Sequence, residues 1–185
     1  MEVKGTAIAA NPRFIRQKFG EVGFQCWLNA LHPGAREIYG KPIMVSAFFP
    51  IKEVLVEPTE KICELFYEGD LKGAWEAGRF SAHIALENIS KAFIKLGSIR
   101  FIIQRASRIM PSYYIPSEMQ VVQNEPDRAL LRITQFSEMH RTIEFRIGGW
   151  IQRALEMGGG RDPKVDITKS LALKDPYTEF AISWK

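Results

Sequence analysis

The chain has few of the residues that bind metals or form disulfide frameworks. It contains two cysteines, Cys26 and Cys63, and three histidines among 185 residues. The cysteines lie far apart and lack Cys-x-x-Cys spacing, which argues against both a disulfide framework and a zinc knuckle. We therefore expect no bound metal and a reducing, cytoplasmic location.

Long hydrophobic runs and blocks of like charge are also missing. No window approaches the roughly 18 apolar residues of a membrane span, and the opening MEVKGTAIAANPRF lacks the layout of a signal peptide. The 25 basic and 21 acidic residues are interspersed and leave a net charge of +4. Arg100, Arg105 and Arg108 could make one helix face basic, but an ordinary solvated face explains them better. We expect no membrane span and no nucleic-acid partner.

The composition is otherwise that of an ordinary globular protein with one core, because 46% of the residues are hydrophobic and 11% are aromatic. The first half reads as helical. Asn11 before Pro12 predicts a helix start, and Gly20 with Gly23 predicts a kink in that helix, which ends near His32. The stretch from Gly40 to Pro58 shows no clear period and predicts a loop that crosses the core.

Three further helices are predicted before residue 115. One runs from Pro58 through Phe66, and a longer one opens at Gly69 and Asp70, with apolar positions that continue to Ile94. The third covers Ile99 to Met110, where Pro111 is expected to end it.

After Pro116 the hydrophobic period changes from helical to alternating. QVVQ and ALLRITQF flank the turn residues NEPD and predict a hairpin, Arg141 to Met157 predicts a helix, and KVDITKSL with TEFAISWK predicts a second hairpin. With no repeat and no linker, the sequence predicts one α+β domain over residues 1–185. Its mainly helical half, residues 1–115, packs on an antiparallel ββαββ half, residues 116–185.

Three glycines, Gly158 to Gly160, follow the predicted helix Arg141 to Met157. A phosphate-binding loop is disfavoured, because such loops lead into a helix N-terminus, whereas this one leaves a helix whose end exposes carbonyl groups. We expect a C-cap and turn, with at least one of the glycines at positive φ.

Several runs resemble known families. GWIQRALEMGG followed by KVDITKSLALKDPYTEFAISW resembles the C-terminal signature of the 4-vinyl-reductase-type domain, and FYEGDLKGAWEAGRFSAHIAL is similar to a helix of a family of uncharacterised bacterial domains of about this length. The wider superfamily includes haem-based nitric oxide sensors and small subunits of vesicle-tethering particles. This resemblance implies an α+β fold that holds an apolar ligand between helices and sheet.

The chain departs from this superfamily where metals and haem are concerned. Ser170 and Thr178 stand where the metal-binding members carry cysteines, and hydroxyl groups lack the thiolate charge that holds zinc. The Tyr-x-Ser-x-Arg clamp of haem-binding members does not occur. We therefore expect no cofactor, and His83 is the best candidate axial ligand if a haem is bound.

Signatures of catalysis are missing as well, because neither a Gly-x-Ser-x-Gly elbow nor a Cys-His signature occurs. Trp75, Arg79 and His83 recur at every fourth position, so one helix stripe carries them, and Gly78 beside it would allow a close approach. We expect Arg79 to be largely buried and bonded to a carboxylate or to backbone carbonyls.

The sequence hence predicts a non-enzymatic domain that binds a small apolar molecule or a protein partner, and we expect a homodimer. The alternatives are a ligand-free dimeric scaffold, an enzyme on an apolar substrate and a haem-based gas sensor. The candidate ligand-binding residues are Phe48, Phe49, Trp75, Arg79, Phe80, His83, Tyr113, Tyr114 and Trp150.

Overall fold

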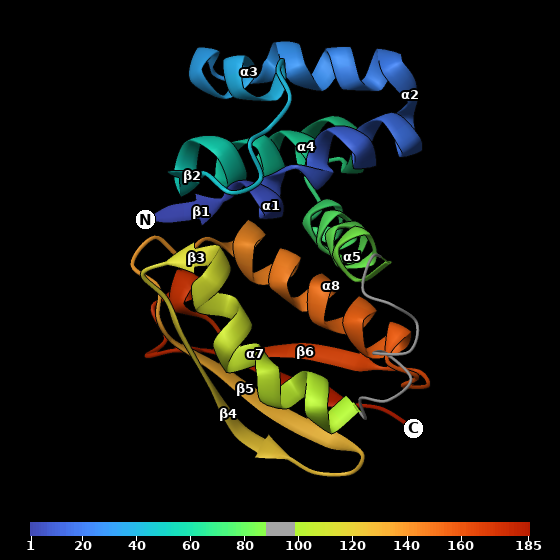
Figure 1. The fold of residues 1–185 in the computed structure, drawn as a ribbon, viewed down its shortest axis with the longest axis vertical. Helices are drawn as coiled ribbons and strands as arrows, with labels where there is room; N and C mark the ends of the chain where they lie inside the picture. Colours follow the sequence, from blue (N-terminus) through green and yellow to red (C-terminus); the bar gives the residue numbers. More distant parts are fainter. Residues whose placement is uncertain (88–98) are drawn as a thin grey trace.

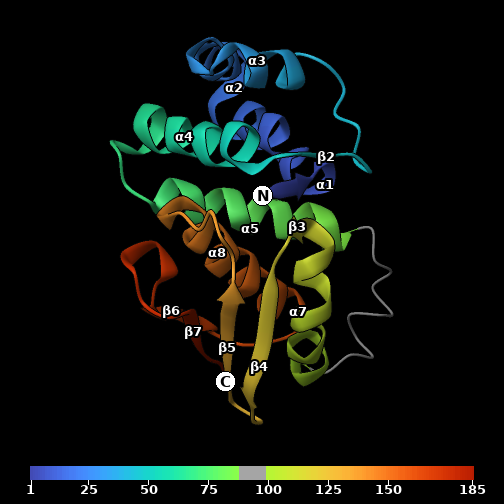
Figure 2. The ribbon, with the colours of Figure 1, turned by 90° about the vertical axis from the view of Figure 1, so that its left-hand side faces the viewer.

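The computed structural model describes residues 1–87 and 99–185. It has the predicted α+β architecture, with a helical layer at one end and an antiparallel sheet at the other (Figure 1). The helical layer contains α1 (Gly5–Ile8), α2 (Ala10–Ala30), α3 (Pro33–Tyr39), a π-helix (Lys52–Val56), α4 (Glu57–Tyr67) and α5 (Lys72–Glu87). Helix α5 lies between the other helices and the second half of the chain (Figure 2).

The second half contains the predicted ββαββ unit, preceded by α7 (Ile99–Tyr113). Its elements are β4 (Glu118–Asn124), β5 (Arg128–Gln135), α8 (Arg141–Met157), β6 (Lys164–Lys169), a 3-10 turn (Leu171–Leu173) and β7 (Thr178–Ser183). The strands form an antiparallel sheet in the order β4-β5-β7-β6. Helices α7 and α8 pack on this sheet, and α5 packs on α8.

A small second sheet joins the two halves. Strand β1 (Glu2–Lys4) lies between β2 (Phe48–Pro50) and β3 (Tyr114–Ile115), and both pairings are antiparallel. Val3, fully buried, stands opposite Phe49 on one side and Tyr114 on the other. The stretch from Gly40 to Pro58 is thus not simply a loop, because it contributes a strand, the π-helix and the start of α4.

Two predicted helix ends are wrong. Asn11 does not cap a helix, because α1 lies directly before α2 and places Asn11 inside α2, where its side chain is buried. Pro111 does not end α7, which continues to Tyr113. A proline in the last turn of a helix removes only one of the final hydrogen bonds, so the helix tolerates it there.

Two other local predictions on described residues are confirmed. Gly20 has φ 73° and kinks α2. Gly159 has φ 94°, and the amide of Gly160 donates to the carbonyl of Leu155, so the three glycines form the expected C-cap. The part of the helix predicted from Gly69 and Asp70 that includes Ile94 lies outside the described residues.

One continuous hydrophobic core runs through both halves. Trp27, with Ile62, fills it between the helices, and Phe180, with Leu155, fills it between α8 and the sheet; all four are fully buried. Within residues 1–87 and 99–185, no helix combines the length and the apolar character needed to cross a bilayer.

Candidate ligand pocket

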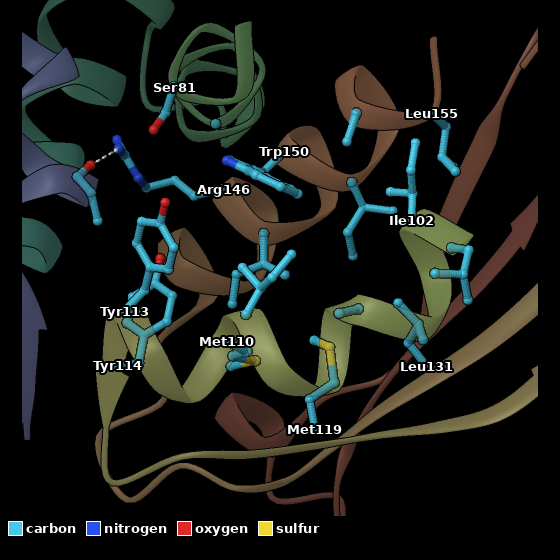
Figure 3. A pocket seen from close by; sticks show the side chains of 18 residues that line it. Ser81, Ile102, Met110, Tyr113, Tyr114, Met119, Leu131, Arg146, Trp150 and Leu155 are labelled. Atoms are coloured by element: carbon cyan, nitrogen blue, oxygen red, sulfur yellow. Dashed lines mark hydrogen bonds between the residues drawn. The ribbon is translucent and has the colours of Figure 1, made fainter. Parts of the chain in front are cut away.

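A pocket with a cavity volume of about 90 Å³ lies between α7, α8 and the sheet. Its lining comes from both halves of the chain and is almost entirely apolar, as the close view shows (Figure 3). The described residues that line it are Ala7, Gly78, Ser81, Ile102, Ile103, Ala106, Ile109, Met110, Tyr113, Tyr114, Met119, Leu131, Arg146, Ile147, Trp150, Ile151, Ala154 and Leu155.

Two helix stripes build the walls. On α7 the lining residues recur at helical spacing from Ile102 to Tyr113, and on α8 they recur in the same way from Arg146 to Leu155. Met119 of β4 and Leu131 of β5 form the floor on the sheet. A pocket of this kind arises where two amphipathic helices lie on one sheet without closing fully against each other.

Arg146 is the one charged side chain among the described residues that line the pocket. It is 4% exposed. Its Nη2 donates to Asn11 Oδ1 at 3.0 Å and to the carbonyl of Ala7 at 3.5 Å, and its Nη1 donates to Thr59 Oγ1 at 3.3 Å. All three acceptors are neutral.

Burial lowers the pKa of Arg146 below its ordinary value, although the nearby Tyr114, Tyr39 and Cys63 oppose the change. Burial also raises the pKa values of Tyr113 and Tyr114. At neutral pH the pocket therefore contains a guanidinium and two protonated phenols, all of which can donate hydrogen bonds.

These polar groups lie at one end of the pocket. In Figure 3 the hydroxyl of Ser81 and those of the two tyrosines point toward the guanidinium of Arg146, whereas Ile102, Leu131 and Leu155 lie at the opposite end. The small sheet holds Tyr114 in this position, because it pairs Tyr114 with Val3.

A close crossing of α5 and α8 sets this geometry. A Cβ atom at Gly78 would lie 2.0 Å from the carbonyl oxygen of Arg146, and one at Gly149 would lie 2.1 Å from that of Trp75. Only glycine allows the two backbones to approach this far. The close approach expected at Gly78 is therefore confirmed, and its neighbour is the backbone of α8.

Arg79 forms a different site, on the α5–α8 contact. Its Nη1 and Nη2 donate to the two carboxylate oxygens of Glu156, at 2.7 and 3.0 Å, and its Nη1 also donates to Gln152 Oε1 at 2.7 Å. Both partners of this ion pair are 25% exposed. The expected carboxylate partner of Arg79 is thus confirmed.

The structure separates the candidate residues into three places. Tyr113, Tyr114 and Trp150 line the apolar pocket. Arg79, Phe80 and His83 instead line a second, more open depression with Lys18, Glu76 and Arg153.

Trp75 lies beside the second depression and packs against α8. Its Nε1 donates to Gln152 Oε1 at 2.8 Å, and its ring lies edge-on to Phe145. Phe48 and Phe49 lie in β2 of the small sheet and line neither cavity.

His83 has no place in the apolar pocket. Its Nδ1 lies 3.3 Å from Nη2 of Arg153, at the second depression. Within the described ranges, no group of three or more His, Cys, Asp or Glu side chains could hold a metal ion. The exposed basic side chains Arg100, Arg105 and Arg108 fit the solvated face expected for α7.

Arg146 was not among the candidate residues, although the sequence contains a pattern that points to it. Ile143, Ile147, Trp150 and Ile151 form the apolar stripe of α8, and Arg146 lies at the same helical spacing, inside that stripe. A charged residue on a buried helix face indicates a specific role, because an unpaired charge in an apolar surrounding costs about 3 kcal/mol or more.

Sequence comparisons gave no relative, since no protein-family model and no curated protein match the chain. Solved structures match its fold. An H-NOX protein from S. oneidensis in the Fe(II)NO ligation state superposes with a TM-score of 0.74 at 11% identity, over 98% of this chain and 99% of that one. The Fe(II) unliganded H-NOX protein from K. algicida superposes with a TM-score of 0.72 at 8% identity, over 98% and 96%.

At these identities the likeness shows the fold alone. It confirms the haem-NO-binding-like fold among those that the sequence resembles. The likenesses to 4-vinyl-reductase-type domains, vesicle-tethering subunits and uncharacterised bacterial domains remain predictions.

Proposed function

We propose that this chain is a non-enzymatic, sensor-like protein that binds a small and largely apolar organic molecule between α7, α8 and the sheet. The observation that carries the proposal is the pocket itself, whose lining is apolar except at one end. Ligand sites in proteins commonly combine apolar walls with a few placed polar groups. A ligand-free scaffold would have no need of such a cavity.

The size of the pocket limits the ligand. A volume of about 90 Å³ is below the roughly 150 Å³ of an engineered cavity that holds benzene. This volume disfavours a broad ring system, and the lining extends along α7 from Ile102 to Tyr113, so we expect a slender ligand. Met110 and Met119 on the pocket wall can adapt to such a ligand, because methionine side chains are flexible.

A haem reading has the fold in its favour, because the matched structures include H-NOX proteins with bound iron. The residues present do not fit a haem. None of the three histidines lines the apolar pocket. The volume of the pocket is far below the roughly 300 Å³ at which drug-sized sites begin. Among the described lining residues Arg146 alone carries a charge, whereas a haem has two propionates. Gas sensing through haem is therefore the second candidate.

An enzyme on an apolar substrate is less well supported. It would need an acid and a base beside the cavity, and no carboxylate or histidine occurs among the described lining residues. The cytoplasmic location and the homodimer remain predictions from the sequence.

The proposed function is tested with ¹³C-methyl-methionine NMR and hexan-1-ol as a neutral probe. We expect the methyl signals of Met110 and Met119 to shift on titration, while that of Met44, which is 67% exposed and outside the pocket, stays in place. Ala106→Phe should abolish the shifts, since it fills the cavity. Gln104→Phe places the same ring on the exposed side of α7 and should leave them intact.

Two results would contradict the proposal: no shift at saturating hexan-1-ol, or equal shifts of all methionines. The haem candidate is tested separately by adding hemin to the purified protein. We expect no Soret band after gel filtration. A band that survives gel filtration and is lost in His83→Ala would establish the haem reading instead.

A further inference from the structure

Arg146 is a buried cation without an anion. No carboxylate forms an ion pair with it in residues 1–87 and 99–185, although twelve other ion pairs occur there, including those of Arg79, Arg132 and Arg141. Residues 88–98 contain no Asp or Glu. The chain therefore supplies no counter-charge for Arg146, and buried charges in proteins are normally paired.

The guanidinium also retains unused donors. It carries five N–H groups, and three of them are taken by Asn11, Thr59 and the carbonyl of Ala7. The Nε–H and one N–H of Nη1 make no hydrogen bond to the described part of the chain. The three bonds to Asn11, Thr59 and Ala7 hold the side chain in place but leave two of its N–H donors without a partner in the described chain.

Three hydroxyl groups lie at the same end of the pocket as Arg146 in Figure 3. Those of Ser81, Tyr113 and Tyr114 form no hydrogen bond with any described residue, and they point toward Arg146 in Figure 3. Each can donate to an oxygen anion. A positioned cation with neighbouring hydroxyl donors is the arrangement that binds a carboxylate, because charge-assisted hydrogen bonds are the strong ones.

We propose that the ligand is a small carboxylic acid with a slender hydrocarbon body, whose carboxylate binds Arg146 and whose chain lies along α7 toward Leu155. This inference deepens the proposed function and rests on it. The polar end of the pocket takes the head group, and the apolar walls from Ile102 to Leu131 take the chain.

A carboxylate suits this site better than a phosphate ester. Arg146 supplies a single positive charge among the described lining residues, which one carboxylate neutralises. A phosphate monoester carries about −1.5 to −2 at neutral pH, so it would leave excess negative charge in an apolar surrounding.

Lys18 and Arg153 do not supply a second charge. They line the other depression and are not among the described residues that line the pocket.

The test compares four probes with the same six-carbon chain at pH 7: hexanoate, hexan-1-ol, hexylamine and hexyl phosphate. Binding is followed by calorimetry and by the methyl signals of Met110 and Met119, which locate the probe in the pocket. We expect hexanoate to bind about tenfold more tightly than hexan-1-ol, since a hydrogen bond to a charged partner is worth about that factor. Hexyl phosphate should bind more weakly than hexanoate, and hexylamine not at all.

Arg146→Met removes the charge and keeps an apolar side chain of similar length. It should lower the affinity for hexanoate far more than that for hexan-1-ol and so abolish the preference for hexanoate. Arg79→Met is the matched control, because Arg79 already has Glu156 as its partner and lies outside the pocket. It should keep the full preference.

The outcomes separate the two proposals. If no probe binds, the proposed function fails and this inference fails with it. If hexan-1-ol binds as tightly as hexanoate, the pocket is real and the inference about the carboxylate is overturned. Tighter binding of hexyl phosphate would overturn it as well.

Should Arg146→Met not fold, Tyr114→Phe decides the question, because it removes one hydroxyl from the polar end and leaves the guanidinium in place. A reduced preference for hexanoate in Tyr114→Phe supports the inference. An unchanged preference in that variant, or hexanoate bound outside the pocket by NMR, overturns it.

Discussion

Two arginines on neighbouring helices have opposite surroundings. Arg79 of α5 is 25% exposed and makes two hydrogen bonds to the carboxylate of Glu156. Arg146 of α8 is 4% exposed and is bonded only to neutral groups. The more accessible cation thus has its anion within the chain, whereas the buried one, which needs an anion more, lacks it.

This difference separates a structural contact from a candidate binding site. Burial alone would raise the pKa of Glu156. Hydrogen bonds and charge from Arg79 and Arg153 outweigh burial and hold this pKa below its ordinary value. The Arg79 site is therefore complete as it stands. The Arg146 site has donors and charge in excess of its partners, and that excess faces a cavity.

The largest expected effect comes from the crossing that carries both arginines. Gly78→Ala would place a Cβ atom 2.0 Å from the carbonyl oxygen of Arg146, so α5 and α8 must separate. We expect the free energy of unfolding to fall by about 3 kcal/mol, measured by urea denaturation. Both arginine sites should lose their geometry together.

Gly34→Ala is the matched control for that prediction. The new Cβ atom at this helical position would meet nothing closer than Glu53 Oε2 at 3.5 Å. We expect a change of about 0.5 kcal/mol or less in either direction. A Gly78→Ala protein as stable as Gly34→Ala would show that the helices do not cross this closely.

A smaller effect is expected from Arg79→Leu, which removes the ion pair with Glu156 and the bond to Gln152. We expect unfolding by urea to require about 1 kcal/mol less free energy, because the pair is partly exposed and screened. Arg128→Leu removes a surface pair whose arginine is 62% exposed and should change nothing measurable. If both variants behave alike, Arg79 belongs to the solvated surface and the comparison between the arginines fails.

The smallest effect is a pH dependence at the Arg79 site. The pKa of Glu156 is lower in the folded chain than its ordinary value of 4.5, so its ion pair stabilises the fold above that pH and is lost as the pH falls through the lowered value. The difference in stability between the wild type and Glu156→Gln should be full near neutral pH and vanish in acid. Thermal melts between about pH 3 and pH 7 measure it. A difference that is constant over this range would contradict the assignment.

Local patterns in the sequence predicted most of the second half. The alternation in KVDITK and TEFAIS predicted β6 and β7, and the helical spacing from Ile143 to Leu155 predicted α8, because each pattern reports one buried face. The sequence also predicted the C-cap at Gly159, since positive φ is a property of the residue itself.

The site was less predictable because it depends on which elements meet. Asn11 had the local features of a helix cap, but tertiary structure uses its side chain as an acceptor for Arg146. Aromatic content alone did not distinguish Tyr114, which lines the pocket, from Phe48, which lies at the edge of the small sheet. The position of the pocket follows from the close crossing of α5 and α8, which no periodicity reports.

The small sheet has a consequence for the order of folding. Its central strand, β1, must pair with β2 and with β3, which are far from it along the chain, and contacts of long sequence separation form slowly. We therefore expect β1 to dock late, after the helices and the ββαββ unit have formed. Because β3 positions Tyr114, the polar end of the pocket would then be among the last parts of the molecule to become native, and a chain that has just folded would gain its ligand site in its final step.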